Sequence, residues 1–582
     1  MLIFRLLSVL SLVLLNGCAS APEQQPIKSE KSLPPQKILA AKPPKPQQSS
    51  KTSINPDVMF MLLTAELAGQ RGQYDLALEG YLEAAKRVKD PRFAERASMI
   101  AMYMKDSKKL NDALALWLAQ DSNNLTARKL AALSALRVGD QAAATMHIET
   151  LLREDPAGFE KSVLELAGAV HKENLVSALE QVLEKLALAH PDKAIVYYMQ
   201  AVLAMQRDDK HLADTKIEQA LHIQSGWDKA LMLKAQLAVL SGNFAKAKQV
   251  LEAASDLYPK DAKFKKLLAQ VLINAKEYKS AAQLYQTIIA DNPQDGESQF
   301  ALALVYLQLT EEGRAQSLLE KLQKDAEWRY RASFYLAKIS EKSGSLNDAL
   351  VWYDKTSDGP FAFDAAVSAI SLLAKDKQFA EAELRLGLLS SKYPKQKLRV
   401  ALLKSEVLNQ QKRYQEAFDL LSTVLVEQPD DSDVLYARAL LADRLGKFEM
   451  LEADLKKILQ KYPENAEVLN ALGYSLANKT TRFAEAESYL LRALKLAPDQ
   501  AVILDSYGWL LFRQGEATKS LDYLQRAYER QKENEIAAHL AEVLWFLNRK
   551  DEAKKLFKDA FKQAPEDEYL LDFKKRFIDE LQ

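Results

Sequence analysis

The sequence predicts an all-α solenoid of about 15 helix–turn–helix units. Three observations indicate this fold class: prolines at a regular spacing, two series of small residues in a fixed phase, and a length of 582 residues. That length is too great for one hydrophobic core, whereas a solenoid buries each unit only against its neighbours. We expect the repeats to span residues 57–566, followed by a capping helix over residues 567–582.

All eleven prolines after Asp57 are expected to lie between helix pairs. Proline lacks an amide hydrogen and breaks a helix interior, so a regular proline marks where a helix ends. Pro91 and Pro360 lie within a few residues of the common phase. The nine prolines that share this phase are Pro156, Pro191, Pro259, Pro293, Pro394, Pro429, Pro463, Pro498 and Pro565. Most junctions are about 34 residues apart, the length of a tetratricopeptide repeat (TPR), which predicts a right-handed TPR superhelix.

A small residue usually occurs 24 residues before each junction, and a second one twelve residues later. Two antiparallel helices joined by a short turn approach closely only where side chains are small. The first series is Ala65, Ala101, Ala132, Ala167, Ala201, Ala235, Ala269, Ala303, Ala337, Ile370, Ser405, Ala439, Gly473, Gly508 and Ala541. The second series is Ala77, Ala113, Ala144, Leu179, Ala213, Ala247, Ala281, Ala315, Ala349, Ala382, Ala417, Leu451, Ala486, Ser520 and Ala553. The step to Ala486 is thirteen, so the turn at Asn478–Arg482 is expected to carry one extra residue.

Residues 1–17 have the features of a lipoprotein signal peptide. Arg5 precedes a largely apolar stretch of ten residues, Leu6–Leu15, which is too short to span a bilayer. The run Leu15-Asn16-Gly17-Cys18 resembles a bacterial lipobox, and Cys18 is the only cysteine of the chain. We therefore expect Cys18 to carry acyl chains such as palmitate that anchor the mature chain. An ordinary cleaved signal with a chance cysteine is the alternative.

The segment from the lipidated cysteine to residue 56 is expected to be a disordered tether. Residues 18–56 are rich in proline, lysine, glutamine and serine and poor in apolar residues, so they cannot bury enough surface to fold. Ala19 follows the cysteine, and no aspartate stands there to indicate retention in the inner membrane. By resemblance to the sorting rules of enteric bacteria, we expect an outer-membrane anchor with the repeats facing the periplasm.

The chain carries no recognisable catalytic or ligand-binding motif. Its six histidines make no His-Glu-x-x-His pair, and we expect His539 to be a packed or surface residue. Nucleophile-elbow and phosphate-loop motifs are missing from the sequence, and the net charge of zero gives no footprint for nucleic acid. We expect no enzyme activity, metal, cofactor, nucleic acid or small-molecule substrate. An enzyme with an unrecognised site in an atypical unit is the remaining alternative.

The first helix of each TPR unit lines a concave groove. With the small residue counted as position 8, TPR geometry directs positions 2, 5, 9, 12 and 13 into that groove. Aromatic residues interleaved with Asn, Asp and Arg are typical of binding hot spots, so the last three units predict a peptide or protein site. Its residues are Asn470, Tyr474, Asp505, Trp509, Phe512, Arg513, Glu542, Trp545 and Phe546. The alternative is that these rings only fill the core between helices.

Three runs near the C-terminus, at residues 470–474, 504–509 and 537–545, resemble a proteobacterial family of TPR lipoproteins. With the lipobox and the repeat number, the chain is similar to the lipoprotein partner of the periplasmic carboxyl-terminal processing protease. Ala541 and Asn548 stand where that family often has Gly, and Tyr507 where it often has Leu or Met. The resemblance implies an adaptor that binds this serine protease and promotes its cleavage of peptidoglycan hydrolases. A scaffold for assembling an envelope complex, such as a pilus, outer-membrane or peptidoglycan-synthesis machine, is the alternative.

Overall fold

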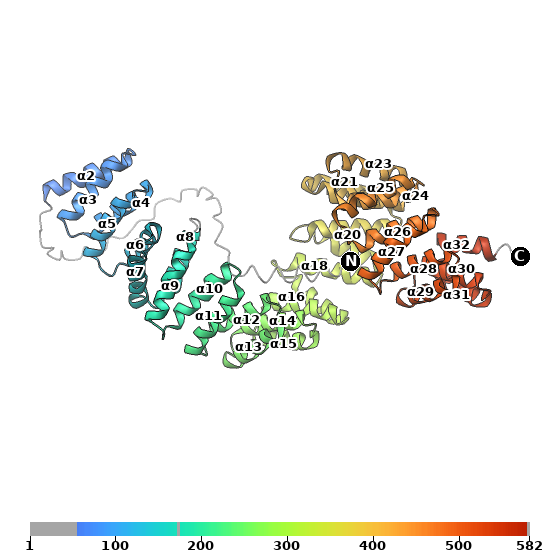
Figure 1. Cartoon of the computed structure of the whole chain (residues 1–582), viewed down its shortest axis with the longest axis horizontal. Coiled ribbons are helices and arrows are strands. Elements are labelled where there is room, and N and C mark those ends of the chain that lie inside the picture. The colour runs from blue at the N-terminus through green and yellow to red at the C-terminus, as the bar shows by residue number, and fades with distance from the viewer. Residues whose placement is uncertain (1–54, 172–174, 579–582) are drawn as a thin grey trace, which may run out of the picture. The chain divides into compact units, whose positions relative to one another are not determined.

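The computed structural model describes residues 55–171 and 175–578. This part of the chain contains helices and no strand, and thirty of its helices form fifteen consecutive pairs ahead of the last one, α32 (Glu568–Phe573). The predicted all-α repeat fold is therefore confirmed. The described residues divide into two compact units, with the boundary between Pro156 and Ala157, and Figure 1 colours the first from blue to teal and the second from teal to red. The expected signal peptide, Cys18 and nearly all of the expected tether lie outside the described residues.

The first unit holds three of the helix pairs. They are α2 (Pro56–Gln70) with α3 (Tyr74–Arg87), α4 (Pro91–Met104) with α5 (Ser107–Gln120), and α6 (Leu125–Val138) with α7 (Gln141–Glu154). Pro91 is the first residue of α4, where a missing amide hydrogen costs nothing, and Asp90 caps that helix by accepting a hydrogen bond from the Arg92 amide. A core of alanine and leucine side chains runs through these pairs and includes the fully buried Trp117.

The second unit continues the pattern through twelve pairs. They are α8 (Phe159–His171) with α9 (Val176–Ala189), α10 (Ala194–Gln206) with α11 (Lys210–Ile223), α12 (Asp228–Leu240) with α13 (Phe244–Leu257), α14 (Ala262–Asn274) with α15 (Tyr278–Asp291), α16 (Gly296–Gln308) with α17 (Glu312–Leu322), α18 (Arg329–Lys342) with α19 (Leu346–Asp354), α20 (Ala362–Lys375) with α21 (Phe379–Lys392), α22 (Lys397–Gln410) with α23 (Tyr414–Glu427), α24 (Ser432–Arg444) with α25 (Phe448–Lys461), α26 (Ala466–Lys479) with α27 (Phe483–Leu496), α28 (Ala501–Arg513) with α29 (Ala517–Arg530), and α30 (Asn534–Phe546) with α31 (Lys550–Gln563). After α32, a short π-helix spans Lys574–Ile578. Each proline after Asp57 lies at a junction between pairs or in the first turn that follows one, as the spacing predicted.

The small residues of both series are buried, as predicted. Ala269 and Ala281 have no exposed surface, and even the larger members Ile370 and Leu451 are at most 1% exposed. Glycine is required where the approach is closest. A Cβ atom on Gly473 would lie 2.6 Å from Leu490 Cγ, well inside van der Waals contact. The small residues therefore mark the positions at which the two helices of a pair approach most closely.

Within most pairs, the turn contains one residue in the left-handed region, which lets two helices reverse direction through a very short loop. Seven of these positions are not glycine: Lys105, Asp208, Lys276, Thr310, Lys377, Lys412 and Asn548. The turn between α26 and α27 is different. It has no left-handed residue. Its length is ordinary, because residues 480–482 between α26 and α27 are as many as residues 445–447 between α24 and α25. The extra residue expected in this turn lies instead in α26, which has fourteen residues against thirteen for α24 and α28.

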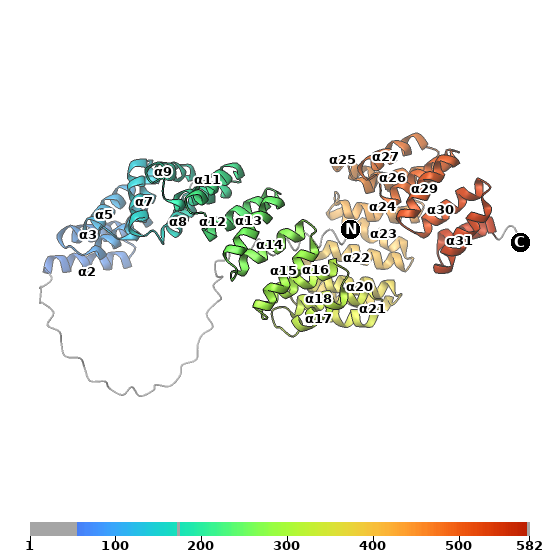
Figure 2. The same cartoon turned by 90° about the horizontal axis from the view of Figure 1, so that it is seen from below.

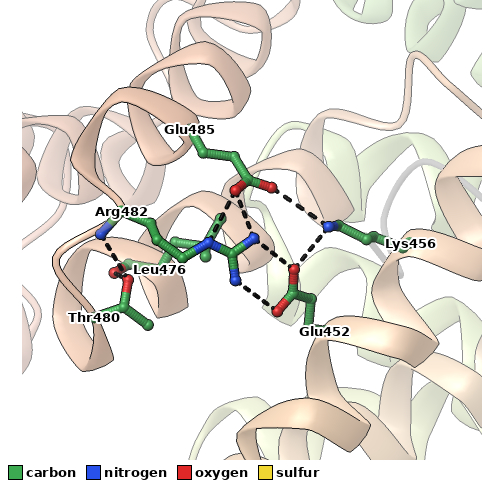
Figure 3. Close-up of polar contacts among 6 residues, drawn as sticks. All are labelled: Glu452, Lys456, Leu476, Thr480, Arg482 and Glu485. Atoms are coloured by element: carbon green, nitrogen blue, oxygen red, sulfur yellow. Dashed lines mark hydrogen bonds and ion pairs between the residues drawn. The ribbon is translucent and has the colours of Figure 1, made fainter.

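Hydrogen bonds and ion pairs hold the turn between α26 and α27 (Figure 3). The Thr480 hydroxyl donates to the Leu476 carbonyl at 2.7 Å and accepts from the Arg482 amide at 3.0 Å. The Arg482 guanidinium donates to both Glu452 oxygens at 2.8 Å and also binds Glu485. Hydrogen bonding to Arg482, with help from Lys456, lowers the pKa of Glu452 to about 2. Side chains thus fix a turn that backbone conformation fixes elsewhere.

Candidate functional site: a concave groove near the C-terminus

The first helices of three successive pairs, α22, α24 and α26, line a groove of about 770 Å³. Its apolar floor includes Leu402, Ala437, Leu440 and Ala471, and Leu440 is 47% exposed. A large apolar side chain open to solvent within a concave surface is an available contact for a partner. The helices that line the groove are held from behind by a continuous core, which includes Leu435, Leu472 and Leu510.

Acidic side chains dominate the charged lining of the groove. Five carboxylates line it, from Glu406, Asp443, Glu535, Glu568 and Asp572, against two cations, Arg444 and Lys479. Asp443 and Lys479 face each other at 3.9 Å. The lining therefore favours a segment that presents basic and apolar side chains together.

The C-terminal helix α32 closes one side of the groove. Its Glu568 forms an ion pair with Arg444, which lies 124 residues earlier in the sequence on α24. Just before α32, Glu566 pairs with Lys377 at 3.4 Å. Leu570 and Phe573 anchor α32 in the core at 0% and 1% exposure. The groove is therefore a preformed surface with a fixed end.

Behind the groove, a buried polar cluster joins α26, α28, α30 and α32. His539 Nδ1 lies 3.0 Å from both carboxylate oxygens of Asp505, and its ring stacks on Trp509 with centroids 4.0 Å apart. The Tyr474 hydroxyl donates to Glu535 at 2.8 Å. The ring of Tyr569 on α32 also lies edge-on to the ring of His539. Because these groups come from four helices, the cluster fixes the last units relative to one another.

The charges in this cluster shift one another's pKa values. Burial by itself lowers the pKa of His539, but Asp505, with Glu535 and Glu542 further away, outweighs burial and raises this pKa above its ordinary value. Burial also raises the pKa of Glu535. The raised pKa keeps His539 protonated up to a higher pH than an unperturbed imidazole.

The structure brings most of the predicted site residues together but buries several of them. Asn470, Asp505 and Trp509 are 8%, 4% and 8% exposed, so the expectation that Trp509 opens into the groove is wrong. The physical reason is that His539 from α30 stacks on the Trp509 ring. The indole N–H of Trp509 also donates a hydrogen bond to Asn478 Oδ1 at 3.3 Å. Core filling, the alternative reading, describes this ring better.

The other predicted residues differ in exposure. Tyr474 lines the groove, whereas Phe512 packs against Trp509 and against Phe546. The side chain of Arg513 is exposed and donates to the Asn478 carbonyl oxygen at 2.7 Å.

Two more of the predicted residues contact the C-terminal segment. Glu542 pairs with Arg576, and Trp545 packs on Phe573 and Phe577. Phe546 is 68% exposed. Contact of this set with a partner stays a prediction.

Groove residues on α22 and α24 were not among the predicted ones. Applied to the units around Ser405 and Ala439, the same position rule indicates ten residues. Four of them, Arg399, Gln410, Asp433 and Tyr436, do not line the groove, and the other six are Leu402, Glu406, Asn409, Leu440, Asp443 and Arg444. All six line the groove. The position rule could therefore have indicated these groove residues, but it was applied only to the last three units and not to the two units directly before them.

The residues that the structure describes contain neither a metal-binding cluster nor a membrane-spanning helix. No three His, Cys, Asp or Glu side chains among them are grouped so as to hold a metal ion. None of the helices in the same residues combines the length and the apolar character needed to cross a bilayer.

The fold and its groove define a helical-repeat scaffold, and comparison with known proteins gives its type. Tetratricopeptide repeat models match residues 238–305, 436–501, 479–535 and 535–567. The chain is 29% identical over 532 residues to the TPR repeat-containing protein PA4667 of Pseudomonas aeruginosa, covering 91% of this chain and 89% of that protein. The matched segments are TPR units, and such repeats form scaffolds for protein–protein interaction.

Solved TPR structures are also similar to this chain. Yeast Tom70 is 15% identical, with a TM-score of 0.34 over 90% of this chain and 99% of that one. A thermophilic TPR protein of Thermus thermophilus is 26% identical, with a TM-score of 0.29 over 31% of this chain and 98% of that one.

Proposed function

We propose that this chain is a periplasmic adaptor, anchored in the outer membrane through Cys18, that binds a carboxyl-terminal processing protease together with its peptidoglycan hydrolase substrates. The observation that carries the proposal is the concave groove of α22, α24 and α26, with exposed Leu440 in its floor and acidic side chains around it. The resemblance of the C-terminal runs to protease-binding TPR lipoproteins supports the choice of partner.

The adaptor acts by proximity and needs no chemistry of its own. Binding two partners on one scaffold turns their encounter into an effectively intramolecular event and raises its rate through effective concentration. The preformed groove adds to this, because little ordering of the scaffold opposes binding. A basic, apolar segment of either partner matches the groove lining.

The test is reconstitution from purified components. Hydrolase cleavage by the processing protease is followed with and without this chain, and we expect an acceleration of about tenfold or more. Leu440→Arg should abolish the acceleration, because it fills the groove floor with a long, charged side chain. Val426→Arg on α23 is the matched control, since Val426 is 83% exposed and lies outside the groove.

Circular dichroism of both variants confirms that they fold. Equal acceleration by the two variants would place the binding surface elsewhere. If the chain does not accelerate proteolysis at all but retains components of an envelope assembly complex in a pull-down, the scaffold function replaces the adaptor function.

A further inference from the structure

Helix α2, at the start of the first unit, is apolar on two opposite faces. One face is buried against α3 through Val58, Ala65 and Ala68. On the other face, four large apolar side chains lie in solvent: Met59 (52% exposed), Phe60 (72%), Leu63 (57%) and Leu67 (51%). No other helix among the described residues exposes more than two large apolar side chains.

This arrangement is unfavourable for the end of an isolated solenoid. Terminal repeats of solenoids need a polar outer face for solubility, and a helix that is apolar all round is normally buried. Figure 2 shows α2 at the outer edge of its unit, next to α3. Among the described residues, the exposed face therefore lacks the neighbour that its composition requires.

The spacing of the exposed residues fits another helix. Phe60, Leu63 and Leu67 follow each other at intervals of three and four residues, which is the seam through which two helices pack. The seam is also symmetric about its centre, which lies at Leu63 and Thr64. An identical helix running antiparallel would place Phe60 against Leu67 of the second copy and bring the two Leu63 side chains together.

The charges on α2 have the same symmetry. Asp57 lies at its start and Arg71 at its end, with Thr64 midway between them. Neither side chain has an ion-pair partner within the described residues, and both are exposed. Antiparallel pairing sets Asp57 of one copy against Arg71 of the other, twice, and also aligns the helix dipoles favourably.

An anionic membrane surface fits this helix less well. Helices that lie on such surfaces carry several Lys or Arg residues beside the apolar face. On α2 and its caps, Arg71 is the one basic residue, against the acidic Asp57 and Glu66.

We propose that two copies of this chain associate through the exposed faces of their α2 helices, paired antiparallel about a two-fold axis at Leu63 and Thr64. The contact is closed, because each copy uses the same face, so it gives a dimer and no filament. One helix face of about 22 Å by 10 Å is smaller than the roughly 800 Å² per partner of a standard interface. The association is therefore weak and concentration-dependent, and it does not require the proposed protease partner.

Cross-linking the full chain tests the contact. In Leu63→Cys, the new thiols lie near the axis, and a short bismaleimide should give a product of twice the chain mass. Leu188→Cys on α9 is the matched control, because Leu188 is 84% exposed but lies in the other unit, and it should give no such product. The unmodified chain reports any contribution of Cys18. Equal yields from the two variants, or a Leu63→Cys product with a different protein, would overturn the proposal.

Charge reversal in the Leu63→Cys background tests the orientation. Asp57→Lys and Arg71→Glu should each lower the dimer yield several-fold, because each sets like charges against one another across the axis. The double variant restores both opposite-charge pairs and should recover the yield. Failure of the double variant to recover, with helicity unchanged in all three, excludes the antiparallel two-fold arrangement.

Discussion

The two ends of the described chain finish their helical stacks in different ways. At the C-terminal end, α32 buries Leu570 and Phe573 completely and leaves one large apolar side chain, Leu571, at 43% exposure. At the N-terminal end, α2 leaves Phe60 at 72% exposure beside three further apolar residues. Among the described residues, the C-terminal end covers its apolar core with its own last helix, whereas the N-terminal end leaves an apolar face exposed. The fixed end borders the proposed binding groove, and the open end is the proposed dimer contact.

The largest expected difference between the ends concerns the anchoring phenylalanines. Phe573→Ala should lower the free energy of unfolding of the C-terminal units by about 3–5 kcal/mol, because it leaves a cavity in a packed aromatic cluster. Phe60→Ala should change it by less than about 0.5 kcal/mol. Denaturant unfolding followed by tryptophan fluorescence, with hydrogen exchange to locate the loss, makes the comparison. Similar losses in both variants would mean that α2 is covered.

The next effect concerns the buried His539–Asp505 pair, which has no counterpart at the N-terminal end among the described residues. His539→Gln removes a charged hydrogen bond and should cost the C-terminal units about 1.5–3 kcal/mol at pH 6. The folded-state pKa of His539 is raised, so its contribution is full below the unfolded value of about 6.5 and is lost as pH rises through the folded pKa. The raised pKa of Glu535 acts in the same direction at lower pH.

Thermal unfolding of the C-terminal units between pH 6 and pH 9 measures this dependence. We expect the wild-type chain to lose stability over that range, and the slope to flatten in His539→Gln. A variant that keeps the full slope would assign the pH dependence to other groups.

Two glycines should respond in opposite directions to the same substitution. Gly473→Ala places a Cβ atom 2.6 Å from Leu490 Cγ and 3.1 Å from the Ala486 carbonyl oxygen, which should cost about 1–3 kcal/mol. Gly69→Ala in α2 meets only Ala77 at 3.8 Å and should stabilise by about 0.5–1 kcal/mol through helix propensity. Melting temperatures that move the same way in both variants would contradict the packing distances.

The smallest expected effects come from surface ion pairs. Arg482→Ala breaks contacts to Glu452 and Glu485 in the turn after α26, and it should cost less than about 1 kcal/mol because the Arg482 side chain is 40% exposed. Arg92→Ala near the N-terminal end breaks one pair with Asp90, at 80% exposure, and should have no measurable effect. Unfolding at low and high salt distinguishes the two sites. Added salt should detectably reduce only the contribution of the Arg482 ion pairs to the free energy of unfolding.

The sequence predicted those parts of the fold that depend on local volume. Alanine or glycine at a close approach, and proline at a junction, leave a signal at one position, so the helix pairs could be counted from the sequence. The extra residue before Arg482 was detectable in the same way. Exposure could not be predicted from such a signal. Trp509 is buried because His539, thirty residues later, lies on its ring.

Contacts across many units were also beyond the repeat pattern. The Arg444–Glu568 pair depends on how small rotations accumulate over several helix pairs, and single positions do not encode that sum. The groove residues of α24 are the opposite case. Leu440, Asp443 and Arg444 occupy positions that usually line the concave face of a TPR unit, so they were predictable. The prediction was instead placed in the last units because those units carry aromatic residues.

The central claim is that the groove of α22, α24 and α26 holds a segment of another protein. Photo-cross-linking in intact cells tests it most directly, with a photoreactive residue in place of Leu440 in one variant and of Val426 in another. The account predicts adducts to a second protein from position 440, reduced when the acidic lining residues Glu406 and Asp443 are also changed to lysine, and none of that product from position 426. Equal adducts from both positions, or none from position 440, would contradict it.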